Sequence, residues 1–229
     1  KISYQQYDYK QTAVIANVTH ELANKNTAYE RFSEQGPCAL LPRTSLDQAT
    51  YFSGVVWPWP NDRLEYVKSL SKSQILSKLQ KLFGYKLGKF LDIGELQFFP
   101  LWRVTSDQLF KKRVLLLGNA ANHIHPVGGQ GFNLGLRDVK CFSKLLADNI
   151  QGLISTNFAG DIIEQIFENY ENLRTDDHQN LQNSTHHLLG LFSSQNKFLK
   201  VGRKIGMAFC NHSNLLTNLI ADQSMGLNV

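Results

Sequence analysis

One stretch, from Arg113 to Asp138, constrains the fold more than any other part of the sequence. It begins with the apolar run from Val114 to Leu117, a pattern that predicts a strand buried on both faces. Glycines follow, and from Phe132 onward apolar residues recur at helical spacing. A helix that begins after such a loop offers free N–H groups and a partial positive charge. The order strand, glycine loop, helix therefore predicts a seat for an anion or an electron-rich ring edge.

The glycines of this stretch do not follow the dinucleotide fingerprint Gly-x-Gly-x-x-Gly. Gly129 and Gly131 begin that pattern, but Leu134 stands where the third glycine belongs. The order strand, glycine, helix is also common in plain connections between elements. On spacing alone, both a binding loop and an ordinary turn are consistent with the sequence.

Composition indicates an ordinary globular chain in a reducing compartment. The 229 residues are 42% hydrophobic and 19% charged, and no apolar run approaches the length needed to span a bilayer. Cys38, Cys141 and Cys210 are far apart and predict neither a disulfide framework nor a zinc site. The formal charge of +5 permits contact with anionic lipid without requiring it, and we expect no nucleic-acid partner. Because the sequence begins with Lys1 rather than Met, we expect the true N-terminus to lie upstream.

The first sixty residues read as strands joined by polar turns, which favours an antiparallel or mixed sheet over βαβ units. The expected strands are Thr12–Val18, Ala28–Phe32, Cys38–Leu41 and Thr50–Trp57. Two short helices should follow, capped by Asn61 and Ser73, and then an interrupted strand from Leu91 to Trp102.

The chain after Asn149 is expected to be helical. Asp161 and Asp176 are each expected to begin a helix, and a third helical pattern runs from Lys197 to Ile220. Basic residues gather in the first part of this last pattern, namely Lys197, Lys200, Arg203 and Lys204. They are consistent with a helix lying on an anionic membrane surface, and equally with a solvated helix face.

Two ordered strings resemble a known family. From Gly118 the chain reads Gly-Asn-Ala-Ala-x-x-x-His-Pro-x-x-Gly-Gln-Gly-x-Asn-x-Gly-x-x-Asp, which resembles the second flavin-binding motif of the FAD-dependent aromatic hydroxylases. The version with Gly-Asn in place of Gly-Asp is most similar to the ubiquinone-biosynthesis branch, typified by 2-octaprenyl-6-methoxyphenol hydroxylase (UbiH). Residues 28–32 and 36–42, Ala-Tyr-Glu-Arg-Phe and Gly-Pro-x-Ala-Leu-Leu-Pro, resemble the same branch.

The resemblance implies an α/β fold, α+β in this portion, that corresponds to the C-terminal part of the p-hydroxybenzoate-hydroxylase-like FAD monooxygenase fold. Residues 1–103 would be the remaining part of a mixed or antiparallel substrate-binding sheet. Residues 104–150 would be the ring-side part of the FAD-binding domain, and residues 151–229 the C-terminal helices. The N-terminal Rossmann unit of the family, which grips the ADP half of FAD, is missing, so we expect this portion to be inactive alone.

The resemblance also implies a function. It is that of a flavin monooxygenase in which NADPH or NADH reduces FAD and a flavin hydroperoxide hydroxylates the ring of a prenylated phenol in ubiquinone biosynthesis. The implied partners are that phenol, O₂, other ubiquinone-biosynthesis proteins and a membrane surface. We expect a cytoplasmic protein, with peripheral contact at the inner membrane face.

The motif assigns a set of cofactor-binding residues and requires neither a catalytic side chain nor a metal. Asn119 takes the position of an aspartate near the ribityl chain, Pro126 would stiffen the loop against the ring system, and Gly128 and Gly131 would allow close backbone approach. The amides of Phe132 and Asn133 would face the pyrimidine edge. The full set is Gly118, Asn119, Pro126, Gly128, Gly129, Gln130, Gly131, Phe132 and Asn133.

Two other readings of the chain compete with this one. His123 and His125, separated by one residue at the end of the expected strand, could serve as ligands of a metal-dependent hydrolase. That reading leaves Pro126 and the glycine loop unexplained. The other reading is a non-catalytic fragment, since the sequence lacks the fingerprint for the ADP half of FAD.

Overall fold

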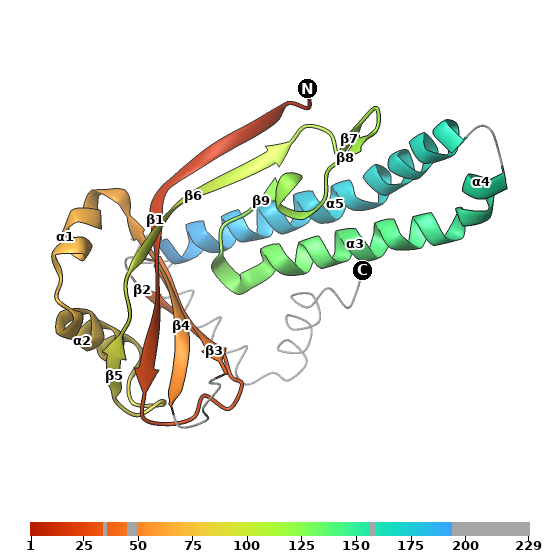
Figure 1. The fold of residues 1–229 in the computed structure, drawn as a ribbon. Coiled ribbons are helices and arrows are strands. Elements are labelled where there is room, and N and C mark those ends of the chain that lie inside the picture. Colours follow the sequence, from red (N-terminus) through yellow and green to blue (C-terminus); the bar gives the residue numbers. More distant parts are fainter. Residues whose placement is uncertain (34–35, 45–49, 156–158, 194–229) are drawn as a thin grey trace. The chain divides into compact units, whose positions relative to one another are not determined.

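The computed structural model of the chain describes residues 1–33, 36–44, 50–155 and 159–193 (Figure 1). The chain forms two compact units. One unit is Asp8–Leu101, and the other combines Lys1–Tyr7 with the chain from Trp102 onward. The functional boundaries after residues 103 and 150 stay a prediction.

The strands of the first sixty residues form an antiparallel sheet, as the sequence predicts. The sheet has the strand order β2-β3-β4-β1-β6-β9, and β5 pairs with β1. Antiparallel pairing joins β1 to β4, β4 to β3, β3 to β2, β1 to β5 and β6 to β9. The strand bounds are β1 Tyr4–His20, β2 Tyr29–Ser33, β3 Gly36–Arg43, β4 Tyr51–Pro60, β5 Phe90–Ile93, β6 Gln97–Ser106 and β9 Asn122–His123.

Within the unit Asp8–Leu101, one face of the sheet is covered by α1 (Leu64–Ser69) and α2 (Lys72–Phe83) (Figure 1). Alternate residues of the strands point into this core, as the period of a half-buried strand requires. The helices bury Val67, Ile75, Leu79 and Phe83 against them. The strand residues of the core include Val14, Ala16, Val18, Cys38, Leu40, Val55, Trp57 and Trp59.

Both predicted helix caps in this unit are wrong. Asn61 opens a short 3₁₀ turn, Asn61–Arg63, and its side-chain oxygen accepts a hydrogen bond from Thr12 Oγ1 (2.8 Å) instead of capping α1. Helix α2 is capped by Ser71, not Ser73. Ser71 forms a capping box with Gln74, in which each side chain binds the other's backbone amide.

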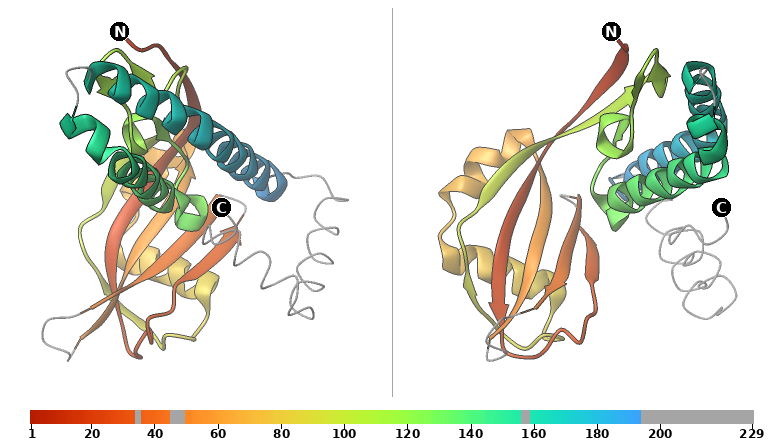
Figure 2. Two further views of the ribbon diagram at one scale, coloured as in Figure 1. Left: turned by 90° about the vertical axis from the view of Figure 1, so that its right-hand side faces the viewer. Right: turned by 45° about the vertical axis from the view of Figure 1, so that its right-hand side comes forward.

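The second unit contains α3 (Gln130–Asp148), α4 (Ile150–Ser155) and α5 (Ala159–Ser193), and α3 lies beside α5 in both views of Figure 2. The sequence predicts two helices, after Asp161 and after Asp176, where the structure has the single helix α5. Asp177 lies inside α5, where its carboxylate pairs with Arg174 and Arg137. Asp176 therefore does not begin a new helix, and its neighbour Asp177 belongs to an ion-pair cluster between α5 and α3.

The predicted strand Val114–Leu117 is also wrong in extent and burial. Only Val114–Leu115 is a strand (β8), paired with β7 (Phe110–Lys111) in a small hairpin, and Val114 is 55% exposed. The three leucines that follow Val114 are half-buried against the cluster of Leu109, Ala121 and Tyr170. Their apolar side chains thus belong to one cluster with Tyr170 of α5 and with Phe142 and Leu145 of α3, as well as with Leu109 and Ala121.

Helix α3 begins at Gln130, two residues earlier than its apolar spacing indicates, and buries a different face. Of the five residues that define the apolar spacing, Phe132, Leu136 and Val139 are 75%, 52% and 51% exposed, and Phe142 and Leu146 are half-buried. Leu134 and Asp138 are the buried residues instead. Helical periodicity identifies a stripe of apolar residues but does not say which neighbour covers it.

None of the helices in the described part of the chain is long and apolar enough to cross a membrane. The predicted basic helix Lys197–Ile220 lies outside the described residues.

Candidate functional site

A turn of 3₁₀ helix, η2 (Gly118–Ala120), packs against helix α3. Gly118 has φ +55°, a conformation that a residue with a Cβ rarely adopts. Its Cα lies against Gly135, since a Cβ added to Gly135 would be 3.5 Å from it. The Gly118 amide donates a hydrogen bond to Asp138 Oδ2 at 3.0 Å. The turn is therefore fixed to α3 by a close backbone contact and by a bond to a carboxylate.

The loop before α3 is held in shape by hydrogen bonds to its own backbone. The Val127 amide donates to Nδ1 of His125 (3.1 Å), and the Gly129 amide donates to the Pro126 carbonyl (3.0 Å). Gly128 and Gly129 have φ +69° and +62°, and both are exposed. A Cβ added at Gly129 would meet no atom within 4 Å. The loop thus presents open backbone at Gly129, whereas the Gln130 side chain donates a hydrogen bond to the Gly128 carbonyl (3.2 Å).

Helix α3 begins directly after this loop without a side-chain cap, and its first turn contains no acidic residue. The amides of that turn lack intrahelical partners, as at any helix start. They lie where the partial positive charge of the helix is greatest. The end of α3 can therefore accept a negatively charged group from outside the chain.

The carboxylate of Asp138 is fully buried and accepts hydrogen bonds from two other segments of the chain, the η2 turn and α5. Besides Gly118, its partners are Nε of Arg174 (2.8 Å) and Nε2 of His178 (2.7 Å), both on α5. Nη2 of Arg174 also lies 2.5 Å from Asp177 Oδ2, which lies 3.3 Å from Nε of Arg137. Two carboxylates and two guanidinium groups thus balance in charge at the α3–α5 contact.

His178 also belongs to a chain of hydrogen bonds between polar side chains that are largely buried. Thr105 Oγ1 donates to Gln182 Oε1 (2.9 Å), Gln182 Nε2 donates to Asn122 Oδ1, and Asn122 Nδ2 meets Nδ1 of His178. An amide nitrogen can only donate, so Nδ1 of His178 must accept. The hydrogen of the neutral ring is then on Nε2, where it is donated to Asp138. This series of hydrogen bonds fixes both the tautomer and the orientation of His178.

Competing effects set the ionisation of Asp138 and its neighbour Tyr170. Burial alone raises the pKa of Asp138, but hydrogen bonds from His178, Arg174 and the Gly118 amide bring this pKa below its usual value of 3.8. Burial and the nearby Asp138 charge raise the pKa of Tyr170 well above 10.0. Asp138 is therefore the anion of the cluster, and Tyr170 stays a neutral phenol beside it.

His125 is buried and neutral. Burial lowers the pKa of His125 from 6.5 to about 4. The hydrogen bond from the Val127 amide acts in the same direction, because Nδ1 can accept it only while that nitrogen carries no proton.

The predicted cofactor-binding residues fall into two groups, one in the η2 turn and one where the loop meets α3. Asn119, Gly128, Gly129 and Phe132 are exposed, and the others are partly covered: Gly118, Pro126, Gln130, Gly131 and Asn133. Their binding role stays a prediction. The sequence reasoning missed Asn122, Arg174, His178 and Gln182. The only signal for them was the i, i+4, i+8 spacing of the last three on one helix.

His123 and His125 do not form a metal site with other described residues. Across the described ranges, no group of three or more His, Cys, Asp or Glu side chains could hold a metal ion. Strand β9 ends at His123, so the two side chains do not share a strand face, and His125 is engaged by the loop backbone.

The sheet, the glycine turn fixed to α3 and the uncapped start of that helix define a flavoprotein fold, and the chain belongs to the FAD binding domain family, whose model matches residues 5–158. Among curated relatives, ubiquinone hydroxylase UbiL of Rhodospirillum rubrum is 30% identical over 95% of this chain and 48% of its own length. The 3-demethoxyubiquinol 3-hydroxylase of Escherichia coli is 25% identical over 96% of this chain and 54% of its own length. The chain spans about half the length of these relatives.

Solved structures agree on the fold. PqsL of Pseudomonas aeruginosa superposes with a TM-score of 0.67 at 16% identity, over 88% of this chain and 53% of that chain. The p-nitrophenol 4-monooxygenase PnpA of Pseudomonas putida gives a TM-score of 0.62 at 12% identity, over 99% of this chain and 56% of that chain. The predicted family and fold class are thereby confirmed.

The local geometry fits an FAD ring edge. Gly131 has helical backbone, and a Cβ placed there would make an ordinary contact of 3.6 Å with Ile124 Cγ1. The described chain itself therefore does not require glycine at this position. Open backbone at Gly129, beside an uncapped helix start, would suit a flat group with a negatively charged edge.

The Asp138→Asn variant tests the buried cluster. Asparagine keeps the shape of the side chain but leaves the buried Arg174 guanidinium without one of its two carboxylates. We expect the free energy of unfolding to fall by about 3–5 kcal/mol, the usual cost of removing one partner of a buried ion pair. Denaturation in urea, followed by circular dichroism, measures this. Asp148→Asn, at an exposed site of the same helix, should change stability by less than about 0.5 kcal/mol, and equal losses would contradict the cluster's role.

His125 predicts a specific dependence of stability on pH. The pKa is 6.5 in the unfolded chain and about 4 in the folded one, so only the unfolded state takes up a proton between these values. The contribution of His125 is complete above pH 6.5 and declines by about 3 kcal/mol as the pH falls toward 4. In His125→Asn, the side-chain oxygen can still accept from Val127 but does not titrate. The free energy of unfolding of this variant should fall less between pH 6.5 and 4 than that of the wild type. Parallel curves of this free energy against pH would refute the assignment of His125 as a buried neutral side chain.

Proposed function

We propose that this chain supplies the ring-side part of an FAD monooxygenase that hydroxylates a prenylated phenol in ubiquinone biosynthesis. The observation that carries the proposal is the ordered string from Gly118 to Asp138, placed at the uncapped start of α3. Membership of the FAD binding domain family and the names of the curated relatives support it. When bound, FAD would supply electron transfer from NADPH or NADH and the activation of O₂.

The residues of the chain would position the flavin without taking part in covalent chemistry. The first amides of α3, from Gly131 to Asn133, would face the electron-rich edge of the ring. Such a helix end is worth about 0.3–1 kcal/mol, or about 2 kcal/mol when partly buried. Pro126 would limit the motion of the loop beside the ring. The bond between Asp138 and the Gly118 amide would hold Asn119, which is exposed, in a fixed position toward the ribityl chain.

Other ubiquinone-biosynthesis proteins would be partners, and the prenyl tail of the substrate favours peripheral contact between the protein and a membrane surface. The net charge of +5 is compatible with an anionic surface.

The direct test of the function is a measurement of substrate-stimulated oxidation of NADPH or NADH. We expect a longer protein that contains this chain to bind FAD and to oxidise the reductant faster when a prenylated phenol is supplied. Mass spectrometry of the product should show one added oxygen that derives from O₂. Protein that stays colourless in excess FAD would refute the proposal.

Gly131→Val tests the site within that protein. The branched side chain would occupy the space where the flavin edge approaches, whereas the helical backbone tolerates it. We expect FAD affinity to fall at least about tenfold, or ~1.4 kcal/mol, with fold stability changed by less than about 1 kcal/mol. Flavin fluorescence titration measures the first and thermal unfolding the second. Gly190→Val, at an open position on α5, is the matched control and should bind FAD normally. Unchanged affinity in Gly131→Val would show that the loop is an ordinary turn.

A further inference from the structure

The segment from Tyr66 to Leu91 has a one-sided charge. It contains six lysines and no aspartate, glutamate or arginine. Lys68 and Lys72 pair with Glu65 and Asp92 at its two ends (2.8 and 3.4 Å). The other four lysines make no ion pair among the described residues: Lys78, Lys81, Lys86 and Lys89. Solvated protein surfaces normally intersperse both signs of charge, whereas this segment carries an excess of positive charge, faced by the Glu21 carboxylate that accepts from the Lys89 amide (2.7 Å).

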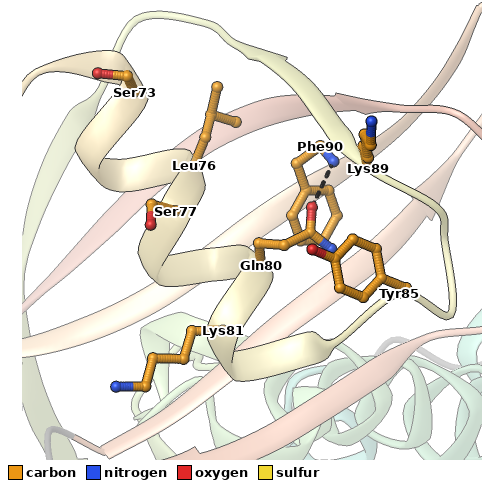
Figure 3. Close-up of a pocket in the computed structure, with 8 residues that line it drawn as sticks. All are labelled: Ser73, Leu76, Ser77, Gln80, Lys81, Tyr85, Lys89 and Phe90. Atoms are coloured by element: carbon orange, nitrogen blue, oxygen red, sulfur yellow. Dashed lines mark hydrogen bonds between the residues drawn. The ribbon is translucent and has the colours of Figure 1, made fainter.

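Two of these lysines line one open pocket of about 580 Å³, drawn in Figure 3. Ser73, Ser77 and Lys81 follow one another at four-residue spacing along α2, away from the face that α2 buries. Tyr85 and Lys89 come from the turn between α2 and β5. The hydroxyl and ammonium groups thus surround an apolar base that includes Leu76 and Phe90. We call these seven residues the α2 basic face.

The α2 basic face is held in shape by Gln80. Its Oε1 accepts from the Phe90 amide (2.9 Å), as Figure 3 shows, and its Nε2 donates to the carbonyls of Gly84 (2.6 Å) and Gly88 (3.1 Å). One side chain therefore ties the turn to the helix at three points. The backbone that carries Tyr85 and Lys89 is thereby fixed to α2 before any ligand is present.

The side chains of the α2 basic face suit lipid headgroups better than a protein. Ammonium and hydroxyl groups bind phosphate, and Tyr85, which is 69% exposed, is a residue type enriched where a bilayer meets water. Protein interfaces are enriched in arginine and depleted in lysine, the reverse of this segment. Long lysine stems can lie along apolar surface while their charges reach phosphates.

We propose that the α2 basic face is the surface by which this protein rests on an anionic membrane. Headgroup phosphates would lie between Lys81 and Lys89, with the Tyr85 ring at the level of the headgroups. This inference rests on the membrane contact proposed above and is independent of the hydroxylation, because it uses none of the flavin-motif residues.

The experiment is flotation of the 229-residue chain with vesicles. We expect binding to vesicles of equal parts phosphatidylcholine and phosphatidylglycerol, loss of binding at high salt, and little binding to pure phosphatidylcholine. Lys81→Gln with Lys89→Gln should weaken partitioning about 25-fold, at about fivefold for each lysine. The charge-matched control is Lys140→Gln with Lys144→Gln, at exposed sites of α3, and should bind nearly as the wild type does.

A fluorescent variant locates the contact independently. Emission from Tyr85→Trp should shift to shorter wavelength when anionic vesicles are added, whereas Tyr4→Trp, at a residue 56% exposed in the other unit, should not respond.

Each contrary outcome rejects a distinct statement. No binding to anionic vesicles would refute the membrane contact itself and leave the hydroxylase proposal standing. If the two double variants lose vesicle binding equally, or if neither loses it, the α2 basic face is not the contact. Binding to immobilised polyglutamate without binding to vesicles would assign the surface to an acidic protein and overturn the proposal.

Discussion

The buried carboxylate of Asp138 connects three segments that are far apart in the sequence. It accepts from the Gly118 amide, from Arg174 and from His178, and so joins the glycine turn to both α3 and α5. Removing a charge from water costs several kcal/mol, which such contacts offset only when the geometry is good and further hydrogen bonds are made. An apolar pair of similar volume could pack the two helices as well. What the carboxylate adds is a defined position for the Gly118 amide, and hence for the turn.

The need for every buried polar group to find a hydrogen-bond partner extends from Asp138 to Thr105. Asn122 presents its nitrogen to His178 and its oxygen to Gln182. Each side chain in this hydrogen-bond network therefore has one orientation that satisfies its neighbour. A fully satisfied buried network of this kind is rigid, and a partly satisfied one is costly. The tautomer of His178, the ionised state of Asp138 and the position of the turn are therefore linked. A change at β6 or β9 would therefore be felt at the η2 turn through these hydrogen bonds, in addition to the direct packing of β9 against η2.

Features that depend on a local sequence pattern can be predicted from this sequence, whereas features that depend on residues far away in the sequence cannot. Alternation in the first strands and the ordered string after Gly118 are local, and they give the sheet, the turn and the family. Which face of α3 is buried is not local, because it depends on which neighbour lies over the helix, and Leu136 and Val139 of its apolar stripe are exposed. Arg174 and His178 look like surface residues of a polar helix until Asp138 is placed against them. Their role depends on a contact across about forty residues, which no short pattern contains.

The glycines of the motif divide into those that the chain requires and one that it does not. Gly118, Gly128 and Gly129 have positive φ, so the turn and the loop would be strained by any other residue, with or without a ligand. Gly131 differs, because its backbone is helical and a Cβ there would only touch Ile124. Glycine loses more backbone freedom on folding than any other residue, so it stabilises a helical position less than alanine does. A glycine at position 131 thus weakens the helix without a structural reason in the described chain, and an approaching ligand is the physical reason that would account for it.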